Sequence, residues 1–107
     1  MLHDNFEWDD DKAQRNLKKH GVSFDDAALV LSDEDGERFH VEQYDDEHIT
    51  GADRYVTTAS HPDDRRLVLI IAWTDRSTAH ARVTRIFSAR AATLAERKKY
   101  AKEISDR

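Results

Sequence analysis

Three arginines stand where a charged side chain could carry out phosphate chemistry: Arg54, Arg85 and Arg90. Each lies in or beside a segment predicted to be a strand, where an apolar or small residue would cost less to bury. A partly buried guanidinium needs a paired anion or a ligand, and its planar fork matches the oxygens of a phosphate. We therefore expect these residues to bind a phosphate and to stabilise the charge that develops on it during a reaction.

Each arginine also has a simpler explanation, an internal ion pair with an acid such as Asp53, Asp75 or Glu96. His20 has two interpretations as well. In the last turn of a predicted helix, it can pack beside Leu17 and complement the negative end of the helix dipole. Close to a phosphate, it could act as an accessory acid or base, because histidine side chains titrate near neutrality.

Four further residues could extend an RNA-binding surface around the arginines. Lys19, Lys98 and Lys99 would attract the phosphate backbone. Trp73, at the end of a predicted strand, could stack on a base. Lysine-rich helix faces are commonly only solvated, however, and a tryptophan commonly packs in the core, so both alternatives stay open on the sequence alone.

Other familiar kinds of catalytic site are missing from the sequence. The chain contains no cysteine, which excludes disulfides and thiolate chemistry. Its six histidines are scattered, without the close pairs typical of zinc sites. Its three glycines are isolated, so neither a P-loop nor a dinucleotide-binding fingerprint is present. We therefore expect a protein that uses no metal and no cofactor.

Positive charge is concentrated near the end of the chain, although the formal net charge is −5 and charged residues make up 36% of the sequence. Residues 1–81 carry nine Lys and Arg against nineteen Asp and Glu, whereas residues 82–107 carry eight against three. A surface built from the last quarter could attract nucleic acid. A final helix that is merely solvated would explain the same run of charge.

The start of the chain predicts two helices that meet at a sharp corner. An aspartate at position 9 or 10 can cap the first helix, and Gly21 suits its left-handed end. Ser23 can cap the second helix. The spacing of Ala13, Leu17 and His20 places them on one face of the first helix, which we expect to pack against the rest of the protein.

Four strands and a closing helix are predicted to follow, with the strands at residues 38–42, 54–60, 67–73 and 82–89. The third strand is apolar without alternation, so both its faces should be covered and it should be central. Strict alternation along the fourth places Arg85, Phe87 and Ala89 on one face.

A capping box of Thr93 and Glu96 starts the last helix near Leu94. Its apolar stripe is predicted to contain Leu94, Tyr100, Ala101 and Ile104. The sequence thus predicts a single domain over residues 1–107 of the α+β class, with two N-terminal helices, a four-stranded mostly antiparallel sheet and a C-terminal helix.

Several blocks of sequence resemble the BrnT-type toxins, in the right order and at nearly the right distances. Phe-Glu-Trp-Asp at residues 6–9, Asn-Leu at 16–17 and Lys-His-Gly-Val-Ser-Phe at 19–24 are similar to the opening of that family. Asp-Arg-Tyr at 53–55 resembles its acid-arginine-aromatic strand start, and Arg-Ile-Phe-Ser-Ala-Arg-Ala at 85–91 resembles its ending. The resemblance therefore covers nearly the whole chain.

This resemblance implies a RelE-like fold and a metal-independent endoribonuclease that inhibits translation. The ribose 2′-hydroxyl would attack the adjacent phosphate, with arginines in place of an acid–base pair. The partner it implies is a ribbon-helix-helix antitoxin, which neutralises the toxin, and operator DNA would be reached only through that antitoxin. The longest apolar run, residues 67–73, is too short to span a bilayer, and the first residues lack the character of a signal peptide, so we expect no membrane association and a cytoplasmic location.

Some positions depart from the family pattern and favour a rival from another functional class. Thr50 and its neighbours lack the glutamate that often precedes the acid-arginine-aromatic segment, and Asp75 replaces the usual glutamate after the central strand. These departures and the net charge of −5 fit a non-catalytic, toxin-like binding module that pairs with a DNA-binding antitoxin and contributes to operator repression.

Overall fold

The computed structural model describes residues 2–3, 5–33, 40–44 and 54–107. Thr50, Asp53 and the first two residues of the strand predicted at 38–42 lie outside these ranges. The described helices are α1 (Asp10–His20), α2 (Phe24–Leu31) and α3 (Leu94–Ser105). The described strands are β1 (Leu2–His3), β2 (Phe6–Glu7), β3 (Val41–Tyr44), β4 (Tyr55–His61), β5 (Asp64–Asp75) and β6 (Thr84–Ala91).

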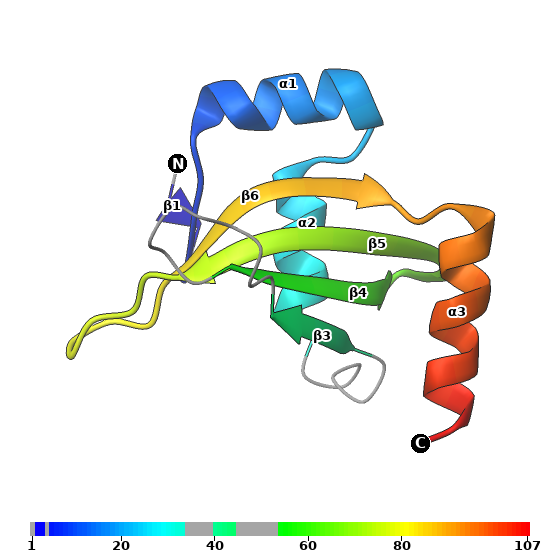
Figure 1. Ribbon diagram of the computed structural model, residues 1–107. Helices are drawn as coiled ribbons and strands as arrows, with labels where there is room; N and C mark the ends of the chain where they lie inside the picture. The colour runs from blue at the N-terminus through cyan, green and yellow to red at the C-terminus, as the bar shows by residue number, and fades with distance from the viewer. Residues whose placement is uncertain (1, 4, 34–39, 45–53) are drawn as a thin grey trace.

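The described strands form one six-stranded sheet in the order β1-β2-β6-β5-β4-β3 (Figure 1). Neighbouring strands are antiparallel, except that β2 runs parallel to β6. The α+β class, the four longer strands and the central place of β5 are confirmed. The predicted number of strands was wrong, because β1 and β2 have two residues each and are too short to show a periodic pattern.

Strand boundaries also differ from the prediction around the turn between β5 and β6. Strand β5 extends to Asp75, and β6 begins at Thr84. The backbone N–H of Arg76 donates to the carbonyl of Val83 at 2.8 Å. The two chain segments therefore stay hydrogen-bonded for one residue past the strand ends. Together these segments form an exposed hairpin that projects from one end of the sheet (Figure 1).

Local signals in the sequence set the ends of the helices. A side-chain oxygen of Asp9 accepts hydrogen bonds from the backbone N–H groups of Asp11 and Lys12, and these bonds, with Lys12 contributing most, hold the pKa of Asp9 below its ordinary value. Gly21 ends α1 with φ of 71°, a conformation that favours glycine. The hydroxyl of Ser23 accepts from the N–H of Asp26 and starts α2.

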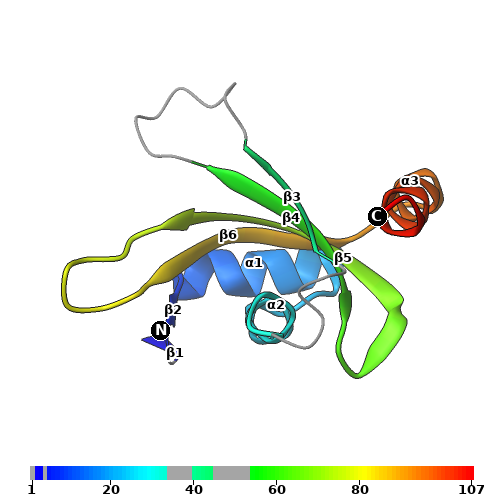
Figure 2. The same ribbon diagram turned by 90° about the horizontal axis from the view of Figure 1, so that it is seen from below.

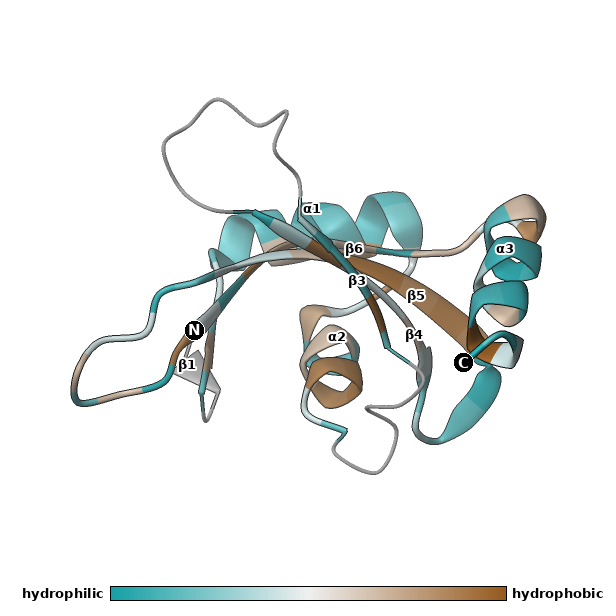
Figure 3. Ribbon diagram, turned by 60° about the horizontal axis from the view of Figure 1, so that its bottom comes forward, coloured by the Kyte–Doolittle hydropathy of each residue, from teal (hydrophilic) through white to brown (hydrophobic). Residues whose placement is uncertain are grey.

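Helices α1 and α2 cover one face of the sheet and enclose the hydrophobic core there (Figure 2). The largest fully buried apolar side chains come from α2 and from β5 and β6: Phe24, Val30, Leu69, Ile71 and Ile86. Hydrophobic residues accordingly gather on α2 and β5, whereas most of α1 is hydrophilic (Figure 3).

The predicted inner face of α1 was wrong for two of its three residues, because Leu17 and His20 are both exposed. Leu17 is 50% exposed, whereas Asn16 is buried with 8% exposure. The amide of Asn16 donates to the carbonyls of Val22 and Ala89 at 3.0 and 2.6 Å, and its oxygen accepts from the N–H of Ala89 at 3.2 Å. The spacing of apolar residues along α1 could not predict this contact, because the residue that makes it is polar.

Helix α3 stands apart from α1 and α2 and lies against the other face of the sheet (Figure 2). The capping box of Thr93 and Glu96 is present, as predicted. The predicted apolar stripe is not a buried one, because no residue of α3 is buried and Leu94 is 64% exposed. The helix is tethered to β6 mainly through polar groups, which leaves space between it and the sheet.

Candidate active site on the open face of the sheet

A row of side chains crosses the face of the sheet that α1 and α2 leave uncovered, here called the open face. Successive residues of a strand point to opposite faces, so Arg85, next to the buried Ile86, faces away from the core. Arg85 pairs with Glu7 of β2 on one side and with Thr74 of β5 on the other. These three residues therefore share the open face.

Arg54 joins this row from the start of β4. The next residue, Tyr55, stacks on Trp73 on the core side, at 4.7 Å between ring centroids, so Arg54 is directed to the open face. Its guanidinium carbon lies 5.5 Å from the ring centroid of Phe87. The ammonium of Lys12 lies 5.7 Å from the same centroid, so one aromatic ring holds two cations by its electron-rich face.

A β-bulge in β6 makes this arrangement possible. Ala72 pairs with Ser88 and Trp73 pairs with Ile86, which leaves Phe87 as an extra residue in β6. Such a bulge shifts the alternation of side chains and redirects the extra one. The sequence prediction that Arg85 and Ala89 share a face was therefore wrong: Ala89 is fully buried in the core, whereas Arg85 and Arg90 both lie on the open face.

Glu7 is the acidic residue that approaches Arg76 and Arg85, and it was not among the site residues predicted from the sequence. Its Oε1 atom lies 3.7 Å from Nε of Arg76 and 3.8 Å from Nη1 of Arg85. The side chains of Glu7 and Arg85 are both about 30% exposed, so the carboxylate is partly shielded and still accessible. The alternation of Phe6, Glu7 and Trp8 was the available signal for a short strand, but three residues are too few to identify one.

Arg90 belongs to a different part of the open face. Its guanidinium donates two hydrogen bonds to the carboxylate of Glu96, at 2.7 and 2.8 Å. These bonds, together with one from the N–H of Thr93, lower the pKa of Glu96 to about 2, and the same pair raises the pKa of Arg90. Arg90 thus has the internal ion pair that was one of the two explanations for this arginine on the sequence alone. It lies five residues beyond Arg85, roughly 16 Å along an extended strand.

Arg54, Arg76 and Arg85, with Glu7, are here called the arginine cluster. No described contact joins the other predicted site residues to it. His20 and Lys19 are exposed in the last turn of α1, and Lys98 is exposed on α3. Lys99 lines a groove between α3 and the sheet. Trp73 packs against the core side of the sheet and donates from Nε1 to the hydroxyl of Thr57 at 2.8 Å.

Two further features bear on the chemistry that the described part of the chain can support. No group of three or more His, Cys, Asp or Glu side chains suited to a metal ion occurs among the described residues. Within the same ranges, none of the helices has the length and apolar character needed to cross a membrane.

Comparison with known protein families matches this chain over most of its length. The sequence profile described as "Ribonuclease toxin, BrnT, of type II toxin-antitoxin system" matches residues 8–96. A comparison with curated proteins found no significant match. The matched range includes Arg54, Phe87 and the bulged strand that carry the candidate site. On this evidence, the chain belongs to the BrnT family of ribonuclease toxins of type II toxin–antitoxin systems.

Proposed function

We propose that this toxin cleaves RNA without a metal ion, by attack of a ribose 2′-hydroxyl on the adjacent phosphate. It thereby inhibits translation in the cytoplasm until a ribbon-helix-helix antitoxin neutralises it, and it reaches operator DNA only through that antitoxin. The observation that carries the proposal is the approach of Arg76 and Arg85 to Glu7, with Arg54 over the ring of Phe87, which lies two residues from Arg85 on β6. Family membership supports ribonuclease activity in general.

The cluster has the parts that such a reaction requires. The 2′-oxygen forms a bond to phosphorus and passes its proton to water, while the bond between phosphorus and the 5′-oxygen breaks and the departing oxygen takes a proton from water. The products are a 2′,3′-cyclic phosphate and a 5′-hydroxyl. Arg54 and Arg85 stabilise the extra negative charge on the phosphate oxygens in the transition state. Glu7 holds the guanidinium groups of Arg76 and Arg85 together despite their mutual repulsion, so that they are in place before RNA binds.

Arg90 and His20 have secondary roles in this proposal. Arg90 meets RNA with its charge already offset by Glu96, which accepts a hydrogen bond from each of its terminal nitrogens. His20, exposed at the end of α1, serves as an accessory acid or base only for RNA that extends to that helix end. Lys19, Lys98 and Lys99 supply sequence-independent attraction to the phosphate backbone, and Trp73 provides a rigid support for the sheet.

The test uses purified toxin freed of antitoxin, with RNA and DNA of the same sequence and an excess of chelator. RNA should be cut to products with cyclic phosphate ends, and DNA should remain intact because it lacks the attacking 2′-hydroxyl. Loss of cleavage in the chelator would exclude the metal-independent mechanism. If the free toxin neither cuts RNA nor inhibits translation, the chain is a non-catalytic partner of a DNA-binding antitoxin, an alternative that its net charge of −5 favours.

Variants of the open face test the assignment of roles. Arg85→Ala should slow cleavage by about 10²-fold or more, the scale of losing one donor to a transition-state charge. Lys98→Ala is the control, because an exposed lysine contributes only screened attraction. Glu7→Gln keeps the shape of the side chain and should lower kcat more than it changes KM. Equal losses in Arg85→Ala and Lys98→Ala would show that Arg85 is only an electrostatic anchor.

A further inference from the structure

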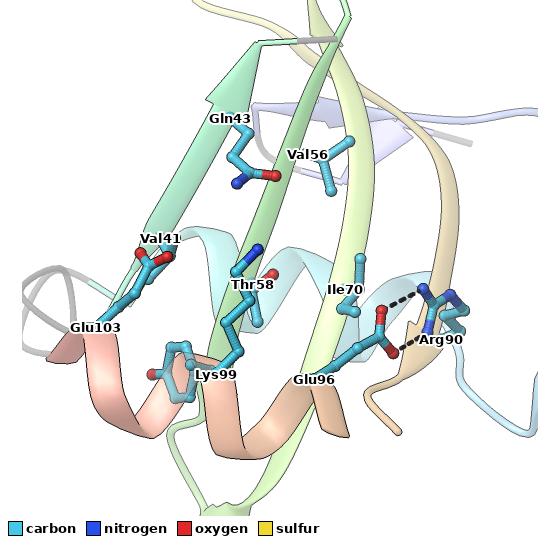
Figure 4. Close-up of a pocket in the computed structure, with 10 residues that line it drawn as sticks. Val41, Gln43, Val56, Thr58, Ile70, Arg90, Glu96, Lys99 and Glu103 are labelled. Carbon is cyan, nitrogen blue, oxygen red and sulfur yellow. Dashed lines mark hydrogen bonds and ion pairs between the residues drawn. The ribbon is translucent and has the colours of Figure 1, made fainter. Parts of the chain in front are cut away.

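A groove separates α3 from the open face of the sheet (Figure 4). Its volume is about 220 Å³. The floor is formed by Val56, Thr58 and Ile70 on β4 and β5, and Lys99 and Tyr100 of α3 stand over it. Because α3 has no buried residue, the groove follows from a helix held above the sheet.

The charges around the groove balance one another. Arg90 is bound to Glu96 at one end, with both hydrogen bonds shorter than 3 Å. Lys99 and Glu103 carry opposite charges on the α3 side. A groove with an apolar floor and no surplus positive charge does not favour a phosphate. It suits a flat, uncharged ring with polar edges, bound by contact with its faces and by a few hydrogen bonds.

The polar group at the end nearest the arginines is the amide of Gln43. Gln43 pairs with Val56 across β3 and β4, and its side chain is exposed. Val56 is two residues beyond Arg54 on the same face of β4, roughly 7 Å away. A nucleotide that follows or precedes a phosphate at Arg54 would therefore reach the groove with its base.

We infer that the groove between α3 and the sheet is a nucleobase-binding subsite, which sets the sequence preference of cleavage. The base lies on Val56 and Ile70, Tyr100 contacts its ring, and the amide of Gln43 bonds to its edge. This inference rests on the proposed ribonuclease function, because the bound base belongs to the RNA whose phosphate the arginines hold. An amide can both donate and accept, so Gln43 can distinguish bases by the pattern of their edges.

Cleavage of RNA libraries randomised on both sides of the cut tests the subsite directly. The wild type should prefer one base, or one class of base, at a position within a few nucleotides of the cut. Gln43→Ala should reduce that preference by about 10-fold, the scale of losing hydrogen bonds to one base edge. Tyr100→Ala should lower kcat/KM by about 10-fold for every base, because ring contact does not depend on base identity.

Matched controls separate the groove from its surroundings. Glu42 is next to Gln43 but faces the other side of β3. Glu42→Ala should therefore leave the base preference of cleavage unchanged. A second measurement does not depend on cleavage: RNA with 2′-O-methyl groups and one 2-aminopurine near the arginine-bound phosphate should lose fluorescence on binding. Tyr100→Ala should abolish that loss while the protein stays folded.

The possible failures are distinguishable. If the wild type cuts no RNA, the proposed function is wrong, whatever the groove binds. If the wild type cuts RNA but Gln43→Ala and Tyr100→Ala keep its preference and its rate, the groove is not a base subsite. If those variants instead weaken only the complex with the antitoxin, the groove is a protein-docking surface and the inference is overturned.

Discussion

Arg85 and Arg90 lie on the same strand and the same face, but their neighbours give the two guanidinium groups different properties. Arg90 makes two short hydrogen bonds to Glu96, so its charge is already neutralised. Arg85 lies 3.8 Å from Glu7, which Arg76 also approaches, so its hydrogen-bonding groups remain available for a phosphate. We therefore expect Arg85 to matter more for catalysis and Arg90 more for holding α3 in place.

The pKa of Glu96 leads to a prediction about stability and pH. Its pKa in the folded protein is about 2, below the ordinary value of 4.5, so the ionised form stabilises the fold. That stabilisation is present above the ordinary pKa and is lost as the pH falls toward 2. At neutral pH, Glu96→Gln should be less stable by about 1 kcal/mol or less, since both partners are more than a third exposed and water screens their attraction.

Urea denaturation at neutral pH and near the pKa of Glu96 measures this difference. Glutamine preserves the capping box with Thr93, so the comparison isolates the loss of charge. Glu103→Gln removes a carboxylate from the same helix and serves as the control. A stability difference between wild type and Glu96→Gln that persists unchanged near pH 2 would contradict the assigned role of the Arg90–Glu96 pair.

Among the secondary-structure elements, α1 supplies through Asn16 the hydrogen bonds that a strand would make at the edge of the sheet. Strand β2 pairs with only two residues of β6, Thr84 and Arg85, so no described strand lies along the outer edge of β6 beyond that point. The amide of Asn16 bonds to both the N–H and the carbonyl of Ala89 and so completes the hydrogen bonding there. This contact fixes α1 to β6 and thereby supports the bulged segment that directs Phe87 to the open face.

Removal of this amide should destabilise the protein strongly. Asn16→Ala leaves buried backbone groups without partners and should lower the free energy of unfolding by about 2–4 kcal/mol. Leu17→Ala is the control at the adjacent, half-exposed position, and its effect should be much smaller. Thermal and urea unfolding compare the two. Similar losses for both variants would mean that α1 is held by its apolar residues and not by Asn16.

The loose packing of helix α3 on the sheet leaves room for the groove. Its tether to the sheet is polar and its sheet-facing residues are only partly buried. A helix packed tightly on the sheet would fill the space over Val56 and Ile70. The groove thus depends on a helix with enough local stability, from its capping box, to form without a buried face.

For the whole molecule, the arrangement of charge matters more than its total. The net charge is −5, but Arg76 and Arg85 both approach Glu7 on the open face, and Arg54 lies over the ring of Phe87. A local positive field can attract an anionic partner to a protein that is acidic overall. An antitoxin that covers this face should therefore present acidic side chains or carbonyl groups to the arginines.

Charge reversal tests this expectation. Arg85→Glu should weaken the complex with the antitoxin by about 10-fold or more at low salt, and by less at high salt, where screening is stronger. Arg90→Glu should also weaken it, but less, because Arg90 is already paired with Glu96. Arg66→Glu alters a 91% exposed side chain in β5 near the β4–β5 turn and should have little effect. Titration calorimetry at two salt concentrations measures all three, and unchanged affinity for both Arg85→Glu and Arg90→Glu would remove these arginines from the interface.

The features that depend on neighbours along the chain were predictable from the amino-acid sequence. The caps at Asp9 and Ser23, the left-handed end at Gly21 and the capping box of Thr93 follow from side chains that bond to backbone groups within four residues. The central place of β5 followed from its unbroken apolar run. Local chemistry of this kind is readable without the fold, because its partners are already close in the sequence.

The contacts between charged residues were not predictable in this way, because they form between distant parts of the chain. The bulge at Phe87 shifts the alternation of β6 and brings Arg85 and Arg90 to one face, and nothing in the local sequence marks where a strand will bulge. Glu7 reaches Arg85 through a parallel pairing between segments almost eighty residues apart. Asn16 is buried because it bonds to the outer edge of β6 at Ala89, where no described strand pairs on that side. Such contacts depend on strand order and register, which are properties of the whole sheet and not of any one segment.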